Sequence, residues 1–168
     1  SDVLNLSLGG RRIVKKERLL GKAIERNIVV VAARGDDRTK TLFPANLQGV
    51  IAVGGPAMPA EAGRLAAPGL EVLTLVPPDG YDCLSGSSIA AAHVSGIVAL
   101  LLERDPALHA SDIESLLVRT SRPVGRDGAD YRMVVSACDA LAELSNKIRC
   151  GADVRPARAA SATTRSAR

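Results

Sequence analysis

The chain has 168 residues, of which 46% are hydrophobic and only 2% aromatic. This length fits one domain or part of one, and a core so poor in aromatic residues must be built from Leu, Val, Ile and Ala, as in a parallel sheet buried under helices. The net charge is +4, but the basic excess lies from Lys147 onward in a stretch rich in Ala, Ser, Thr and Arg, so nucleic-acid binding by a folded basic surface is not expected.

The ends of the chain and its longest apolar run bear on localisation. No apolar stretch reaches the roughly 18 residues that a membrane span requires, so no span is predicted. The chain begins at Ser1 without an initiator methionine, and residues 2–8 already have the character of a core strand. We therefore expect an N-terminal portion to be missing, which makes the absence of a signal peptide uninformative.

The first part of the chain predicts a strand, a helix and a second strand. Residues 3–8 read Val-Leu-Asn-Leu-Ser-Leu and are followed by Gly9 and Gly10, which is typical of a strand that ends in a glycine loop. Residues 12–26 carry apolar side chains at helical spacing among charged ones, and residues 28–32 form a continuous apolar, β-branched run. We predict a βαβ unit with two parallel strands.

Further strands are predicted in the middle of the chain. Residues 50–53 and residues 71–76 are short apolar runs, the second of which is followed by two prolines. Between them, residues 54–69 are rich in Gly, Pro and Ala and are predicted to form a loop.

The remaining elements are predicted to be helices. A long apolar helix should run from Gly86 to about Glu103, and its many small side chains indicate that it packs closely against neighbouring backbone. Shorter helices are predicted over residues 111–120, starting with a capping box of Ser111 and Glu114, and over residues 134–144.

The start of the long helix carries the most informative motif, because residues 86–96 read Gly-Ser-Ser-Ile-Ala-Ala-Ala-His-Val-Ser-Gly. At a helix N-terminus the backbone N–H groups point outward and the dipole is positive, which can stabilise the anion formed when a hydroxyl attacks a carbonyl. Taken alone, Ser87 or Ser88 could equally be a helix cap. The stretch resembles the serine signature of the subtilisin-like serine peptidases, the subtilases, with Ser88 at the nucleophile and Ala92 in place of the usual proline.

Other blocks resemble the same family in the same order along the chain, namely residues 5–10, 29–36, 43–45, 50–54 and 66–69. The likeness covers about residues 2–145. It implies a three-layer α/β fold with a mostly parallel sheet flanked by helices and with the N-terminal part missing. On this basis residues 1–146 are expected to be a partial catalytic domain, and residues 147–168 a basic, disordered tail.

The resemblance also implies roles for individual residues. Ser88 is expected to be the nucleophile, and Asp36 stands at the oxyanion-hole position. Two backbone segments are expected to clamp the substrate peptide as an added strand, namely Ser7, Leu8 and Gly9 on one side and Ala33, Arg34 and Gly35 on the other. The Arg34 side chain would line the pocket for the residue before the scissile bond and favour acidic or polar side chains there, or else point to solvent.

Two departures from the family pattern bear on activity. Position 36 normally holds an Asn that donates a hydrogen bond to the oxyanion, whereas the Asp36 carboxylate cannot donate unless protonated and repels negative charge when ionised. The family orders its triad Asp, His, Ser, yet no histidine precedes Ser88. His93 matches the signature's own non-catalytic histidine and His109 lies before a helix, so this chain alone is expected to be inactive.

The cysteines and the cofactors implied by the family do not identify a metal site or a cellular location. Cys83, Cys138 and Cys150 fit no CxxC metal spacing, and their odd number excludes complete pairing within the chain. Cys83 could be a reactive thiol near Ser88 or, as we expect, a half-buried apolar residue. No cofactor or metal ligand is identified, although calcium is common in the family. The family also suggests a secreted or cell-envelope protein, but the sequence fixes no location.

Three functions remain open at this point. The first is that the chain belongs to a serine endopeptidase whose catalytic His and Asp lie elsewhere in the parent protein, with a peptide or protein as substrate. The second is a non-catalytic, peptide-binding pseudoenzyme of the same family, which Asp36 would favour. The third is an unrelated α/β domain whose basic tail binds polyanions.

Overall fold

The computed structural model describes residues 2–35, 41–55, 65–124, 132–145 and 147–150. Its main sheet is parallel, with the strand order β1-β2-β3-β4. The strands are β1 (Val3–Leu6), β2 (Val29–Ala33), β3 (Val50–Gly54) and β4 (Leu65–Ala66). Helix α1 (Val14–Glu25) connects β1 to its neighbour β2, so the predicted βαβ unit is confirmed.

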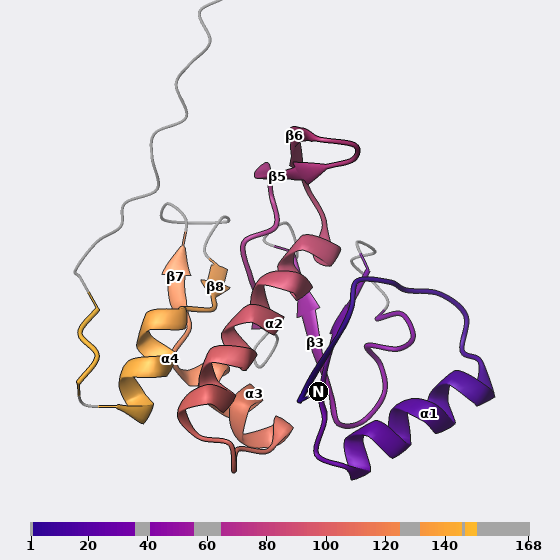
Figure 1. Cartoon of the computed structure of the whole chain (residues 1–168), viewed down its shortest axis with the longest axis horizontal. Helices are drawn as coiled ribbons and strands as arrows, with labels where there is room; N and C mark the ends of the chain where they lie inside the picture. The colour runs from indigo at the N-terminus through magenta and orange to yellow at the C-terminus, as the bar shows by residue number, and fades with distance from the viewer. Residues whose placement is uncertain (1, 36–40, 56–64, 125–131, 146, 151–168) are drawn as a thin grey trace, which may run out of the picture.

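The side chains of β2 show how the layers form, because all five residues of this strand are buried. Val29, Val31 and Ala33 belong to a core cluster with three helices, α2 (Ser87–Arg104), α3 (Ala110–Arg119) and α4 (Ala137–Leu144). Val30 and Ala32 pack on the opposite face with Leu20 of α1 and with Phe43. Helices thus cover both faces of the sheet, which confirms the predicted α/β architecture (Figure 1).

Helix α2 is the main element of the larger core cluster. It packs against β1, β2, β3 and α4, and its buried residues are Ser87, Ala90, Ala91, Val94, Ile97, Val98 and Leu101. By length and composition it could cross a membrane, since its 18 residues have a mean hydropathy of 1.2. The same properties are those of a core helix, and the packing against the sheet accounts for them here.

Two antiparallel hairpins were not predicted. Strand β5 (Val72–Val76) does not join the parallel sheet but pairs with β6 (Gly80–Leu84), and this hairpin projects from the body of the molecule (Figure 1). The second hairpin consists of β7 (Arg122–Val124) and β8 (Arg132–Val134). The short strand β4 lies within residues predicted to form a loop, which corrects that prediction.

Helix α3 begins one residue earlier than predicted and is capped differently. His109 is its N-cap, and the backbone N–H of His109 donates to the Asp112 carboxylate at 3.2 Å. Ser111 lies inside the first turn, so the predicted capping box of Ser111 and Glu114 is wrong. The Nδ1 atom of His109 also lies 2.6 Å from Oδ1 of Asn27, which joins the start of α3 to the end of the α1 segment.

A disulfide joins Cys138 of α4 to Cys150, while Cys83 is a free, exposed thiol. The expectation that Cys83 is half-buried is therefore wrong. The disulfide therefore holds residue 150, which follows the predicted domain boundary, next to α4. The predicted domain boundary after residue 146 remains a prediction, because residues 151–168 of the expected tail lie outside the described residues.

Candidate active site

The Ser88 hydroxyl lies at the N-terminus of α2 and is held there by a tight turn. Gly86, the N-cap residue, has a φ of 143°, a backbone conformation that is open mainly to glycine. Its N–H donates to the carbonyl of Gly69 at 2.8 Å, and a Cβ added at Gly69 would lie 2.8 Å from the Gly86 carbonyl oxygen. The turn at residue 69 therefore fixes the helix start, where Ser87 is buried and Ser88 is exposed.

Ser88 contacts the end of β1 through a reciprocal pair of hydrogen bonds. Its Oγ donates to the carbonyl of Ser7 at 3.3 Å, and the Ser7 Oγ donates to the carbonyl of Ser88 at 2.8 Å. A second link lies two turns further along α2, where the Ser95 Oγ donates to Asn5 Oδ1 at 3.0 Å. The structure thus brings Ser88 next to the first predicted clamp segment, in which Ser7, Leu8 and Gly9 are all exposed.

The second predicted clamp segment follows β2, the direct neighbour of β1 in the sheet. Ala33 is the last residue of β2, and the backbone N–H of Arg34 donates to the carbonyl of Val53 at 2.9 Å. Gly35 has a φ of 87°, again in the region that favours glycine. Because parallel neighbours end at the same edge of the sheet, this segment and residues 7–9 lie at that one edge.

The Arg34 side chain is 4% exposed, so the expectation that it could point to solvent is wrong. Its Nε donates to Thr41 Oγ1 at 3.2 Å, and both residues line a cavity of about 480 Å³ together with Glu114 of α3. Burial raises the pKa of the Glu114 carboxyl above its ordinary value.

Neither histidine lies at Ser88. His93 is an exposed residue five positions further along α2, and five residues at 3.6 per turn place it about 140° around the helix from Ser88. His109 caps α3 and contacts Asn27. Among the described residues, which include both histidines, no imidazole forms a hydrogen bond with the Ser88 hydroxyl.

Two further predicted features find no site in the described residues. Asp36, predicted at the oxyanion-hole position, lies outside the residues that the structure describes. Among those that it does describe, no three His, Cys, Asp or Glu side chains gather to hold a metal ion, so no residue can be named for the calcium that the family implies.

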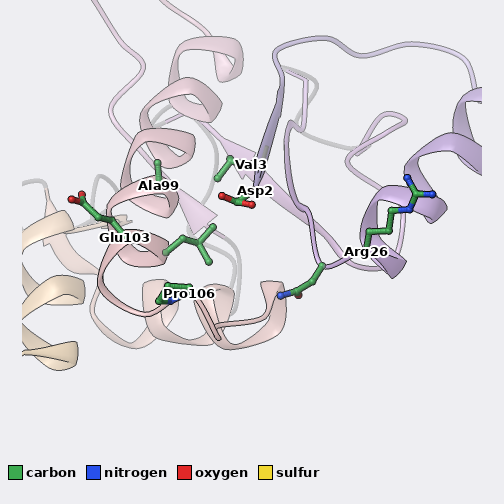
Figure 2. Close-up of a pocket in the computed structure, with 8 residues that line it drawn as sticks. Asp2, Val3, Arg26, Ala99, Glu103 and Pro106 are labelled. Carbon is green, nitrogen blue, oxygen red and sulfur yellow. The ribbon is translucent and has the colours of Figure 1, made fainter.

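A cavity of about 580 Å³ lies at the other end of β1 (Figure 2). It is lined by Asp2 and Val3 at the start of this strand, and by residues of the C-terminal half of α2 such as Ala99 and Glu103. Ser7 and Ser88 lie at the opposite ends of the same strand and helix. The cavity is therefore separate from the candidate site.

Sequence comparisons identify the family of the chain. The chain matches the family model of the subtilases over residues 1–135. It is 35% identical over 141 residues to subtilisin DY of Bacillus licheniformis, covering 74% of this chain and 51% of that protein. It is 32% identical over 144 residues to the major intracellular serine protease of Bacillus subtilis (strain 168), covering 73% and 45%. The chain thus spans about half the length of these two relatives.

Solved structures agree in fold. The prenylagaramide maturation protease PagA superimposes with a TM-score of 0.70 at 25% identity, covering 86% of this chain and 62% of that one. Proteases from Pseudoalteromonas arctica give a TM-score of 0.72 at 26% identity, covering 86% and 52%.

Proposed function

Because the chain belongs to the subtilase family, we propose that it forms the serine-bearing part of an endopeptidase that hydrolyses peptide bonds. The observation that carries this proposal is the position of Ser88. Its hydroxyl is exposed at the positive end of a helix that packs against the sheet, and it lies against the end of β1. In this role Ser88 Oγ attacks the scissile carbonyl, and the N-terminal backbone of α2 stabilises the negative charge that develops.

We propose that the general base of this reaction comes from outside the 168 residues, since neither His93 nor His109 forms a hydrogen bond with Ser88. The described sheet suggests where it docks. Strand β1 pairs with β2 on one side, and no described strand pairs with its other edge. Beside that edge, α2 exposes the small residues Ala92, Gly96 and Ala99 together with Leu100, which is 45% exposed. An open strand edge next to apolar surface is a site for further chain to pack.

We assign the His and Asp of the triad to polypeptide that packs on this edge in the full-length protein. The histidine would accept the proton of Ser88, and the aspartate would orient the histidine. The substrate peptide would lie as an added strand between residues 7–9 and residues 33–35, where main-chain hydrogen bonds give affinity and side-chain pockets give specificity.

The disulfide between Cys138 and Cys150 supports a location outside the reducing cytosol, because disulfides persist in oxidising compartments. We therefore propose that the parent protein is exported, to the medium or the cell envelope. The relatives include proteins named intracellular and cell wall-associated, so membership of the family does not determine the cellular location.

A peptide-binding pseudoenzyme is the second candidate, and the specific observation in its favour is Asp36. An ionised carboxylate at the oxyanion position would oppose the developing charge. Such a protein would keep the clamp segments but would not activate Ser88.

The test is labelling of the full-length protein with a fluorophosphonate probe, which reacts with activated serines. We expect one labelled site, at Ser88, and complete loss of labelling in Ser88→Ala. Ser111→Ala, which alters an exposed serine of α3, is the matched control and should label normally. A folded full-length protein that binds peptides without any labelling at Ser88 would instead be the pseudoenzyme.

A further inference from the structure

The segment from Thr41 to Pro44 joins the two loops that follow β1 and β2. The backbone N–H of Leu42 donates to the carbonyl of Arg34 at 3.1 Å, in the loop after β2. The carbonyl of the next residue, Phe43, accepts from the N–H of Gly10 at 3.0 Å, in the loop after β1. The backbone of residue 42 is thereby fixed from both sides, which leaves its side chain little freedom of position.

The Leu42 side chain meets both clamp segments at their glycines. A Cβ added at Gly9 would lie 3.3 Å from Leu42 Cδ1, and one added at Gly35 would lie 3.0 Å from the same methyl group. Hydrogen atoms of the two glycines therefore already contact the isobutyl group. Leu42 is partly exposed, so this group forms a surface against which a ligand can rest.

The position of this surface matters for a substrate held as we propose. The carbonyl that Ser88 attacks must lie at Ser88 Oγ, next to Ser7. The peptide residue that carries this carbonyl then lies between residues 7–9 and residues 33–35, and its side chain enters the gap between these segments. That gap is the place where Gly9 and Gly35 meet Leu42.

We infer that Leu42 restricts the residue before the scissile bond to a small side chain, Gly, Ala or Ser. A branched or aromatic side chain would have to displace an isobutyl group whose backbone is tied at Arg34 and Phe43. Close-packed sites resist such displacement. This inference rests on the proposed peptidase function and names the substrate class of the same site.

The test compares peptide substrates that differ only in the residue before the scissile bond, with Ala, Leu or Phe there. For the full-length wild-type protein we expect kcat/KM to be about 100-fold higher for Ala than for Phe, within the range that pocket size alone can discriminate. Leu42→Ala should raise kcat/KM for Leu and Phe at least about tenfold, with little change for Ala. Leu42→Val is a milder second variant and should shift the same ratio by less.

Leu47→Ala is the matched control. Leu47 is also a partly buried leucine of this loop, but it packs in the core cluster on the α1 face of the sheet. Its truncation removes the same volume and should leave the Ala-to-Phe ratio unchanged.

The outcomes separate the two proposals. If Ser88 is labelled and peptides are cleaved, but wild type accepts Phe as well as Ala or Leu42→Ala leaves the ratio unchanged, the inference about Leu42 is overturned and the peptidase function stands. If the full-length protein shows neither labelling nor cleavage, the proposed function fails and the inference falls with it.

Discussion

Residue 36, which we propose stands at the oxyanion-hole position, is an aspartate where the family resemblance leads us to expect an asparagine. A side-chain amide there would donate a hydrogen bond to the oxyanion, whereas a carboxylate offers acceptors only when it is ionised. Loss of such a donor lowers turnover by about 10²–10³, a magnitude measured on subtilisin itself. The backbone N–H groups at the start of α2 would then carry the stabilisation of the transition state without help from position 36.

Asp36→Asn should therefore raise kcat of the full-length protein, by about tenfold or more, because it restores a donor and removes a repelling charge. The measurement is steady-state hydrolysis of the Ala peptide. Asp37→Asn removes the same charge one residue further on and is the matched control, with little change expected. A kcat that is unchanged or lower in Asp36→Asn would mean that residue 36 is not at the oxyanion.

The residues of the candidate site that belong to a sequence motif could be predicted from the sequence. Those whose position depends on tertiary contacts could be predicted less well. Ser88 and its contact with Ser7 follow from two motifs 81 residues apart. The direction of the Arg34 side chain does not, because it depends on Thr41 and on a cavity shared with Glu114. Leu42 was missed altogether, since a leucine before Phe43 and Pro44 looks like ordinary core until its contacts with Gly9 and Gly35 are known.

Among the elements, α4 is linked covalently to the segment that follows it by the disulfide. This helix has only eight residues, and Cys138 in its first turn is joined to Cys150, 12 residues further along the chain. Closing a loop of this size removes conformational freedom from the unfolded chain.

Cys150→Ser should therefore destabilise the protein by about 2 kcal/mol, near the lower end of the usual range for a disulfide. Thermal unfolding of the full-length protein checks this, with a fall in Tm of a few degrees. Cys83→Ser, which removes an exposed and unpaired thiol, should leave the Tm unchanged. If reduction and Cys150→Ser both have no effect on the Tm, the disulfide does not contribute to global stability.

The elements that the sequence predicted well are those that bury a continuous apolar run. Strand β2 and helix α2 are of this kind, and their bounds differ by a residue or two from the prediction. Strand β4 has two residues and exists only through its pairing with β3, so its local sequence carries little signal. The two prolines after β5 indicate the end of a strand, but together with Asp79 they form the turn that leads back into β6.

At the scale of the whole molecule, two observations support the proposal that the triad histidine lies in further polypeptide. One edge of β1 pairs with no described strand, and the relatives are longer than this chain. The chain spans about half of subtilisin DY and of the major intracellular serine protease, and neither described histidine forms a hydrogen bond with Ser88. A serine hydroxyl without an imidazole partner is a poor nucleophile.

We therefore expect the isolated chain to react with the fluorophosphonate probe at least about 10⁴-fold more slowly than the full-length protein, the scale on which loss of a triad residue acts. Circular dichroism of the same sample would establish that the isolated chain is folded. Equal labelling rates for the folded chain and the full-length protein would mean that the base lies within these 168 residues.

The cysteine arrangement has a practical consequence for following this protein in solution. With Cys138 and Cys150 joined to each other, a maleimide dye added under non-reducing conditions has a single thiol of this chain to react with, on the exposed strand β6. That strand leads directly into the turn before Ser88. A fluorophore attached there would sense the arrival of a peptide through its change in polarity or mobility, without any substitution in the chain.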